Sequence, residues 1–264
     1  MGLIDYEKLI ELQKNLSFED QLSLNQEWRR LKFQNSFGLF AKEMCGFKDM
    51  NPRTHGPMVR AFESKSRRKL IVVPRDCFKS SIGLQAFALW RLVKNPNIRI
   101  MLDGETLENT KTHLVAIKAF MKSERFIELY GEFEHKDRLW GAEKITVAQR
   151  TNTTLKEPSI FCSGIGVSKT GQHVDLIIGD DYNTDKNSDT PEKCEKITAH
   201  VKYNLSILDS MHGEYVFIGT RYSENDVYGW ILRDLLGLKY LSEGEFKDDE
   251  LAPYLKAVPR PGLS

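Results

Sequence analysis

A lysine and two hydroxyl residues follow a short apolar segment early in the chain. Leu70 to Val73 is the apolar segment, and Pro74-Arg75-Asp76-Cys77-Phe78-Lys79-Ser80-Ser81 follows it directly. A buried strand, a tight turn and a helix opening with Lys-Ser-Ser form a layout that binds nucleotide phosphates. The sequence therefore predicts a phosphate-binding loop, although Val73 and Phe78 stand where the usual pattern has glycine. A plain helix N-cap is the alternative interpretation.

Two adjacent carboxylates end a second apolar segment farther along the chain. Leu176 to Gly179 is predicted to be a buried strand, and Asp180 and Asp181 follow it. Ligands bind outside the carboxyl ends of strands in open α/β sheets, and Mg²⁺ prefers oxygen ligands. We expect Asp180 and the Ser80 hydroxyl to bind Mg²⁺, and Asp181 to orient and deprotonate the attacking water. A solvated loop is the alternative.

Two other segments carry residues suited to contacts with a nucleotide. Tyr215 to Gly219 is another predicted strand and ends in Thr220 and Arg221, a hydroxyl and a guanidinium suited to sensing a γ-phosphate. Arg53 and His55 lie upstream of the phosphate-binding loop and are suited to stacking on an adenine or hydrogen-bonding to it. A salt-bridged surface arginine and an ordinary turn are the plainer alternatives for these segments.

Strands that alternate with helices surround these segments. Apolar periodicity predicts helices over residues 4–45, 80–93, 105–121, 191–205 and 227–236, a loop over 46–57, and strands over 70–73, 98–102, 145–148, 159–162, 174–179 and 215–219. This alternation is typical of an α/β fold with a mostly parallel central sheet and helices on both faces. We expect a helical N-terminal extension (1–45), the sheet-containing domain (46–250) and a Pro-rich linker or tail (251–264).

Composition narrows the classes of function. The formal net charge of +1 confines any nucleic-acid contact to a local patch, such as the basic run at residues 65–69, although a solvated loop explains that run better. The four cysteines are widely separated, which argues against zinc ribbons and disulfide frameworks. No apolar run approaches the ~20 residues that span a bilayer, and the start lacks signal-peptide features. We therefore expect no membrane partner.

In this order and spacing, the segments resemble the ATPase motor domain of phage large terminase subunits, the DNA-packaging enzymes. Many of these proteins have Pro-Arg before the variable part of the phosphate loop and Lys-Ser-Thr/Ser after it, and residues 74–75 and 79–81 match. They commonly carry Thr-Gly-x-x-x-Asp-Leu-Ile-Ile-x-Asp-Asp, which residues 170–181 match closely. Gly219-Thr220-Arg221 looks like their coupling motif. The resemblance covers roughly residues 45 to 225.

The resemblance implies a RecA-like ASCE P-loop ATPase with ATP as substrate and Mg²⁺ as cofactor. It implies that Arg75 senses the γ-phosphate, that Lys79 binds phosphates, and that Asp180 occupies the metal-binding position. Asp181 would take the place of a catalytic glutamate, and its shorter side chain suggests slow intrinsic turnover. Many relatives carry an arginine where this chain has Gln172, and Lys169 and Arg150 are the candidate substitutes for a cation that serves the neighbouring subunit.

The expected function is ATP-driven translocation of double-stranded DNA into a viral procapsid, in the cytoplasm of the host cell. The implied partners are double-stranded DNA, the portal protein, the small terminase subunit and further copies of the chain in a ring, expected to be a pentamer on the procapsid and a monomer in isolation. Full-length relatives continue into a nuclease, for which the chain has no room after Leu251, so we expect an isolated motor domain or a product truncated in the linker at residues 259–264. A helicase-like ATPase and a non-catalytic nucleotide-binding protein are the alternatives.

Overall fold

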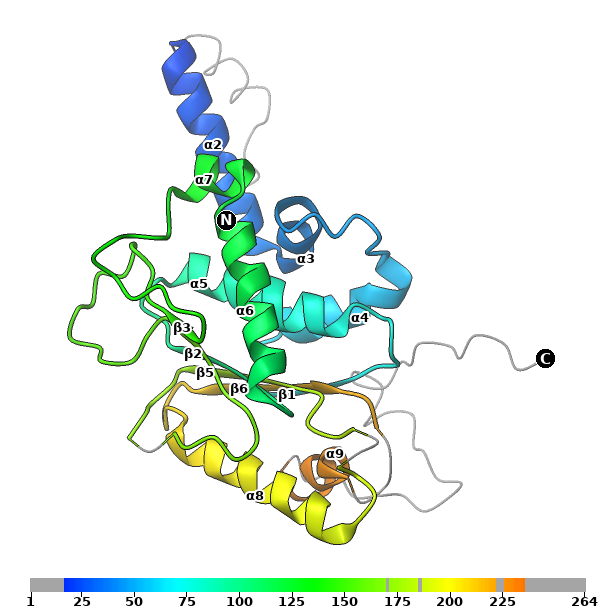
Figure 1. Ribbon diagram of the computed structural model, residues 1–264. Coiled ribbons are helices and arrows are strands. Elements are labelled where there is room, and N and C mark those ends of the chain that lie inside the picture. Colours follow the sequence, from blue (N-terminus) through cyan, green and yellow to red (C-terminus); the bar gives the residue numbers. More distant parts are fainter. Residues whose placement is uncertain (1–16, 170, 185–186, 222–225, 236–264) are drawn as a thin grey trace.

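The fold is built around a mixed β-sheet. The structure is a computed structural model that describes residues 17–169, 171–184, 187–221 and 226–235. Within these residues the strand order is β1-β6-β5-β2-β4-β3 (Figure 1). The strands are β1 (Arg68–Val72), β2 (Ile100–Gly104), β3 (Lys144–Ile145), β4 (Ile160–Cys162), β5 (Leu176–Asp180) and β6 (Glu214–Gly219). All neighbouring pairs are parallel except β3 with β4, which confirms an α/β fold with a mostly parallel sheet.

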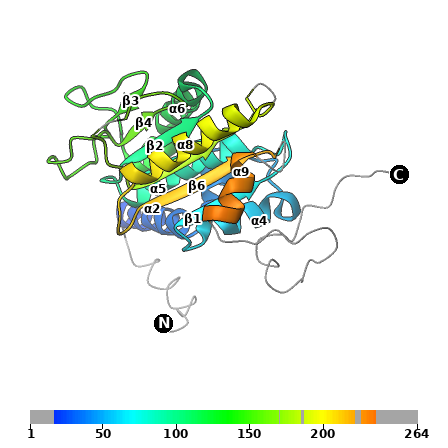
Figure 2. The ribbon, with the colours of Figure 1, turned by 90° about the horizontal axis from the view of Figure 1, so that it is seen from below.

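Helices cover both faces of the sheet (Figures 1 and 2). One face is covered by α2 (Phe18–Asn35), α3 (Phe37–Leu39), η1 (Phe40–Met44), α4 (Pro52–Glu63), η2 (Ser81–Phe87), α5 (Ala88–Lys94), α6 (Leu107–Met121) and α7 (Glu124–Tyr130), and is called the α6 side below. The opposite face is covered by α8 (Pro191–Ile207), α9 (Val227–Trp230) and η3 (Ile231–Leu235). The η segments are π-helical. No helix among the described residues is long and apolar enough to cross a membrane.

The strands distribute their side chains between two apolar layers. Ile178 and Ile218 belong to the core on the α6 side, whereas Ile177 and Phe217 belong to the core under α8 and α9. All five residues of β5 are buried, because helices pack against both of its faces. This double burial is why the central strands are nearly continuous apolar runs in the sequence.

The sequence prediction missed two helices and misplaced the start of a third. α4 begins at Pro52, inside the stretch predicted as a loop, because the Asn51 side chain caps it by accepting from Thr54 N and proline is tolerated in the first turn. The short helix α7 was not predicted. α6 begins at Leu107 with Thr106 as its N-cap, so Glu105 lies in the preceding turn and not in the helix.

The boundaries of the predicted regions are tested only in part. In the helical extension, α2 begins at Phe18 and the helical segments end at Met44, while residues 1–16 lie outside the described residues. The predicted tail at 251–264 also lies outside them. The basic run at 65–69 ends inside β1, where Lys69 is buried and paired with Glu214 at 3.0 Å. That part of the run is therefore not a surface patch.

Gly83 lets the helix that follows β1 pack directly on the sheet. A Cβ atom at this position would overlap the Cδ1 atom of Ile218 in β6. The helical residues after Phe78 are therefore held against the strand that lies between β1 and β5. This close packing fixes the start of the helix relative to the carboxyl ends of the strands.

Candidate nucleotide site at the carboxyl edge of the sheet

Three strands bring the predicted site segments to one edge of the sheet, and β2 ends at the same edge. The register pairs Val72 of β1 with Gly219 of β6, and Asp180 of β5 with Ile218 of β6 and Gly104 of β2. Because these strands are parallel, the loops that follow them leave at the same edge. The segments that begin at residues 73, 105, 181 and 220 therefore surround one region, where open α/β sheets bind ligands.

The structure brings Lys79, Ser80, Asp180 and Asp181 together. Lys79 is buried, and its Nζ lies 3.0 Å from Asp181 Oδ2. Ser80 lies beside Asp180, where it acts to lower the pKa of that carboxyl, and both residues line the same cavity. The lysine and serine of the predicted phosphate-binding loop thus adjoin the two carboxylates of the predicted metal-binding strand.

The loop after β1 adopts the conformation that glycine usually provides. Phe78 has φ +51° and Asp76 has φ +63°, both in the left-handed region. Phe78 stands where the usual pattern has its second glycine, so the backbone keeps that geometry at a cost of about 1–2 kcal/mol for a residue with a Cβ atom. Thr220 Oγ1 donates to Val73 O at 3.1 Å and ties the loop to the end of β6.

The start of the helix after this loop offers backbone donors to an anion. Counting from the start of this helix, Ile82 N is the first backbone amide that donates to another group of the protein, Phe78 O at 2.8 Å. Among the described residues, no acceptor pairs with the amides of Lys79, Ser80 and Ser81. Unpaired amides and the positive end of the helix dipole favour a phosphate group at this position.

Two carboxylate oxygens at the site have no partner among the described residues. Asp180 Oδ1 and Asp181 Oδ1 are both buried and accept no hydrogen bond from that part of the chain. Burial, reinforced by the charge of Asp181, raises the pKa of Asp180 to about 7, against the opposing effects of Ser80 and Lys79. A divalent cation would satisfy both oxygens and relieve the repulsion, so these residues fit Mg²⁺.

The protein supplies only part of a metal shell. No group of three or more His, Cys, Asp or Glu side chains in the described part of the chain is arranged to hold a metal ion by itself. Mg²⁺ commonly binds through one or two carboxylates and completes its shell with substrate phosphates and water. The site therefore suits a metal that arrives with a nucleotide.

The raised pKa of Asp180 predicts a pH-dependent stability of the metal-free protein. A carboxyl with a higher pKa in the folded chain binds more protons when folded, so the unfolding free energy falls as the pH rises from about 4 to about 7. Asp180→Asn removes this penalty and should stabilise the protein at pH 8 by up to about 4 kcal/mol. Urea unfolding in EDTA at pH 8 and at pH 5 measures this, and an equal gain at both pH values would contradict the assignment.

The two residues predicted to contact an adenine, His55 and Arg53, lie in the first turns of α4. His55 is buried in the first turns of α4, and its ring centroid lies 6.0 Å from that of Phe78. His55 Nδ1 accepts from Asn51 N at 3.0 Å, and its buried Nε2 has no hydrogen-bond partner in the described part of the chain. Arg53 is exposed in the same first turn. His55 therefore adjoins the phosphate-binding loop and retains one free polar atom.

The other loop residues lie at the surface or between the surface and the core. Pro74, Arg75 and Asp76 are exposed, and Cys77 is half-buried. Arg221 is half-buried, and its Nε lies 3.8 Å from Asp226 Oδ1, at the start of α9. The structure thus places Arg75 and Arg221 on the loops that follow β1 and β6, the two strands that pair at this edge.

Neither proposed substitute for a trans-acting arginine fits that role. Arg150 is buried, and its guanidinium donates to the backbone oxygens of Glu157 and Ile98. Lys169 is 1% exposed and donates to Asn204 Oδ1 at 2.8 Å. Both cations serve contacts inside the chain, so their burial argues against these two candidates as groups that serve a neighbouring subunit.

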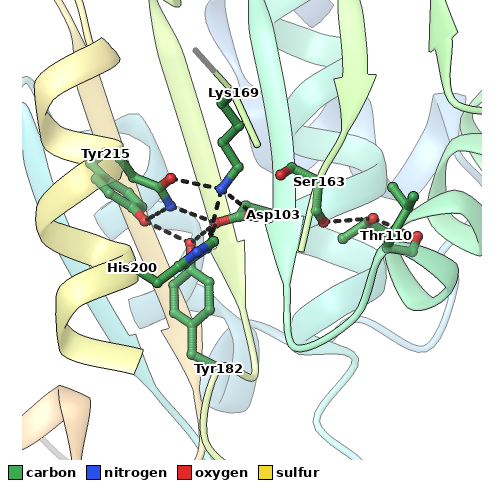
Figure 3. Close-up of polar contacts among 9 residues, drawn as sticks. Asp103, Thr110, Ser163, Lys169, Tyr182, His200 and Tyr215 are labelled. Carbon is green, nitrogen blue, oxygen red and sulfur yellow. Dashed lines mark hydrogen bonds and ion pairs between the residues drawn. The ribbon is translucent and has the colours of Figure 1, made fainter. Parts of the chain in front are cut away.

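Asp103 organises a buried polar cluster behind the site, which the sequence analysis did not identify (Figure 3). Its carboxylate is 0% exposed. It lies 3.4 Å from Lys169 Nζ and 2.7 Å from His200 Nε2, and it accepts from Asn204 Nδ2 at 2.6 Å. Burial alone would raise the pKa of Asp103, but the hydrogen bond with His200 and the charge of Lys169 outweigh it and hold that pKa below its usual value.

The cluster reaches the candidate site through Tyr182. This residue directly follows Asp181, and its hydroxyl donates to Asp103 Oδ2 at 2.7 Å and lies 2.6 Å from the Tyr215 hydroxyl (Figure 3). The tyrosine ring folds back over Gly179, where a Cβ atom would overlap it. Asp181 has φ +40°, and its backbone N donates to Ile218 O at 3.0 Å. Cluster and strand together fix the turn that carries the two aspartates.

Comparison with known proteins adds no family assignment. No protein-family model matches the chain, and a search of curated proteins also found no match. The functional interpretation therefore depends on the geometry of this edge of the sheet and on the motifs of the sequence.

Proposed function

We propose that the chain is an ATP-hydrolysing motor that moves double-stranded viral DNA into a procapsid, as the ATPase domain of a large terminase subunit does. In this proposal Lys79 and the helix start bind the β- and γ-phosphates. Ser80 and Asp180 bind the Mg²⁺ that accompanies the nucleotide, and this ion supplies charge neutralisation at the phosphates. Thr220 and Arg221 couple the end of β6 to the phosphate-binding loop. Arg75 senses the γ-phosphate, and His55 and Arg53 adjoin the base.

One observation carries the proposal: Lys79 contacts the Asp181 carboxylate, and Ser80 lines the same cavity as Asp180 and Asp181, at a single edge. Two segments widely separated in sequence supply the cation and the oxygen ligands that phosphoryl transfer requires. The strand order also supports a RecA-like ASCE P-loop fold, because β6 lies between the strand of the phosphate-binding loop and the strand of the aspartates.

The Lys79–Asp181 ion pair is compatible with a site at which ATP takes the place of the carboxylate. The phosphates of ATP carry more negative charge than one carboxylate, so they compete with Asp181 for the ammonium group. The same pair, together with Phe78 in a glycine position, also favours a second candidate, a non-catalytic nucleotide-binding protein. In that case the pair would stabilise the fold without being exchanged for phosphate during turnover.

DNA packaging, as distinct from ATP hydrolysis, depends on the motif resemblance. Four segments together make up this resemblance: Pro74-Arg75, Lys79-Ser80-Ser81, residues 170–181 and Gly219-Thr220-Arg221. The proposed partners are double-stranded DNA, a portal protein, a small terminase subunit and further copies of this chain in a ring on the procapsid. The proposed location is the cytoplasm of the infected host cell.

The test combines nucleotide binding, ATP hydrolysis and DNA protection. We expect the chain to bind a fluorescent ATP analogue only with Mg²⁺, to hydrolyse ATP, and to protect duplex DNA from nuclease when portal-bearing procapsids and ATP are present. Binding without turnover under all these conditions would support the non-catalytic candidate. Strand separation of a duplex without encapsidation would support a helicase-like motor. The absence of nucleotide binding would reject all three.

A further inference from the structure

Glu105 is a third carboxylate at the edge of the sheet that carries Asp180 and Asp181. It directly follows β2, whose last residue, Gly104, pairs with Asp180 in the neighbouring strand. The helix beyond it begins only at Leu107, so Glu105 occupies the turn between strand and helix. Its half-buried carboxylate therefore lies beside the candidate site, although Glu105 belongs to none of the motifs that predicted that site.

Glu105 lines a cavity of about 330 Å³ together with Ser80, Asp180 and Asp181. Residues of α6, among them Asn109 and His113, also line it. A water molecule takes up about 30 Å³ in the liquid. The cavity therefore has room for a phosphate group and for the water that attacks it.

One oxygen of Glu105 is held in place and the other is available. Oε1 accepts from Thr184 Oγ1 at 2.9 Å and from Asn187 Nδ2 at 3.4 Å. Asn187 Nδ2 also donates to Tyr182 O at 2.9 Å, which links this brace to the residue after Asp181. Within the described part of the chain, Oε2 has no hydrogen-bond partner. The brace thus orients the side chain and leaves an acceptor for a ligand in the cavity.

Asp181 and Glu105 differ in their contacts. Oδ2 of Asp181 lies 3.0 Å from Lys79 Nζ, and its buried Oδ1 is one of the two oxygens that a divalent cation would satisfy. Glu105 has no ion-pair partner among the described residues. The three carboxylates also form no metal-binding group there, so Glu105 is not expected to join the metal shell.

We propose that Glu105, rather than Asp181, orients and polarises the water that attacks ATP, an inference that depends on the proposed function. Glu105 Oε2 accepts a hydrogen bond from the water, and the water oxygen forms a bond to the γ-phosphorus. The bond from the γ-phosphorus to the β–γ bridging oxygen breaks, and its electron pair leaves with ADP. The proton of the water passes to Glu105 and from there to the phosphate product or to solvent.

Glu105→Gln is the sharpest test, because the amide keeps an oxygen that accepts from Thr184 and removes only the charge. We expect single-turnover hydrolysis of Mg-ATP to slow by about 100-fold or more, the range for losing a general base. The dissociation constant of a fluorescent ATP analogue and the melting temperature should stay close to those of the unaltered chain. Asp181→Asn, measured alongside, should change the affinity for nucleotide more than Glu105→Gln does.

Two further variants separate catalysis from structural support. Glu108→Gln makes the same change on the exposed side of α6, where Glu108 pairs with Lys111 at 2.9 Å, and it should hydrolyse ATP at the unaltered rate. Thr184→Val removes a brace and keeps the Glu105 charge, so a purely structural role predicts a defect as large as that of Glu105→Gln. That result, or hydrolysis in Glu105→Gln within about three-fold of the unaltered chain, would overturn this inference alone. Failure of the unaltered chain to bind nucleotide would overturn it together with the proposed function.

Discussion

Lys79→Met should lower ATP hydrolysis by about 100-fold or more, the cost of removing one group that stabilises charge in a transition state. Lys79 is buried at the start of the helix after β1, and its ammonium group lies 3.0 Å from Asp181. In the proposed function the same ammonium group moves to the β- and γ-phosphates when ATP binds. The variant should also bind nucleotide more weakly, since a charge-assisted contact is lost in the ground state.

Lys69→Met is the matched control for Lys79→Met. Lys69 is also buried and also lies 3.0 Å from a carboxylate, that of Glu214, but it is near the opposite end of β1. Arg91 contacts the same Glu214 carboxylate at 2.7 Å, so the variant leaves no unpaired buried charge. We expect Lys69→Met to lose some stability and to keep nucleotide binding and ATP hydrolysis. Equal losses of hydrolysis in both variants, measured on folded protein, would show that Lys79 acts through the fold alone.

The central strands could be predicted from the sequence because both of their faces are buried. Residues 174–179 and 215–219 are apolar runs, and the structure has strands at Leu176–Asp180 and Glu214–Gly219. The strand order could not be predicted, since it depends on which apolar surfaces meet across the sheet. The helix at Pro52 was missed because Asn-Pro marks a loop as readily as it marks a capped helix start.

The site residues that belong to sequence motifs could be predicted, whereas those that reach the site only through contacts across the fold could not. Lys79, Ser80, Asp180 and Asp181 follow apolar strands, and their convergence could be anticipated from the position of carboxyl ends in a parallel sheet. The role of Glu105 was obscured because acidic residues are common in first helical turns, and the sequence assigned it to the helix. The only signal would have been Thr106, which is a better N-cap than the residue before it.

One feature of the sequence, a charged residue inside an apolar strand, points to the Asp103 cluster. An aspartate within the run Ile100-Met101-Leu102-Asp103 breaks an apolar strand that is otherwise fit for complete burial. A buried charge requires a partner, but nothing in the sequence identifies Lys169, which lies 3.4 Å away in the structure. The resemblance to terminases instead made Lys169 one of two candidates for a role at a subunit boundary, and its burial argues against that role.

Asp103→Asn should destabilise the fold by about 3–5 kcal/mol, the cost of breaking a buried ion pair by removing one partner. The substitution leaves the Lys169 ammonium group buried without a counter-ion, and burial already lowers the pKa of Lys169 against the opposing charge of Asp103. It also weakens the acceptor that holds the Tyr182 hydroxyl, and hence the turn that carries Asp181. Urea unfolding at neutral pH measures the loss.

Asp175→Asn is the matched control, because it removes a carboxylate that accepts from Arg99 Nε and Nη2 but is 31% exposed at its side chain. Water reaches this carboxylate and the amide keeps one acceptor, so the loss should be smaller than that of Asp103→Asn. The double variant Asp103→Asn with Lys169→Met should be more stable than the sum of the single losses by about 1–3 kcal/mol, because it leaves no unpaired charge. Additive losses would mean that the two charges act independently, and that Asp103 supports the turn at Asp181 only through Tyr182, His200 and Asn204.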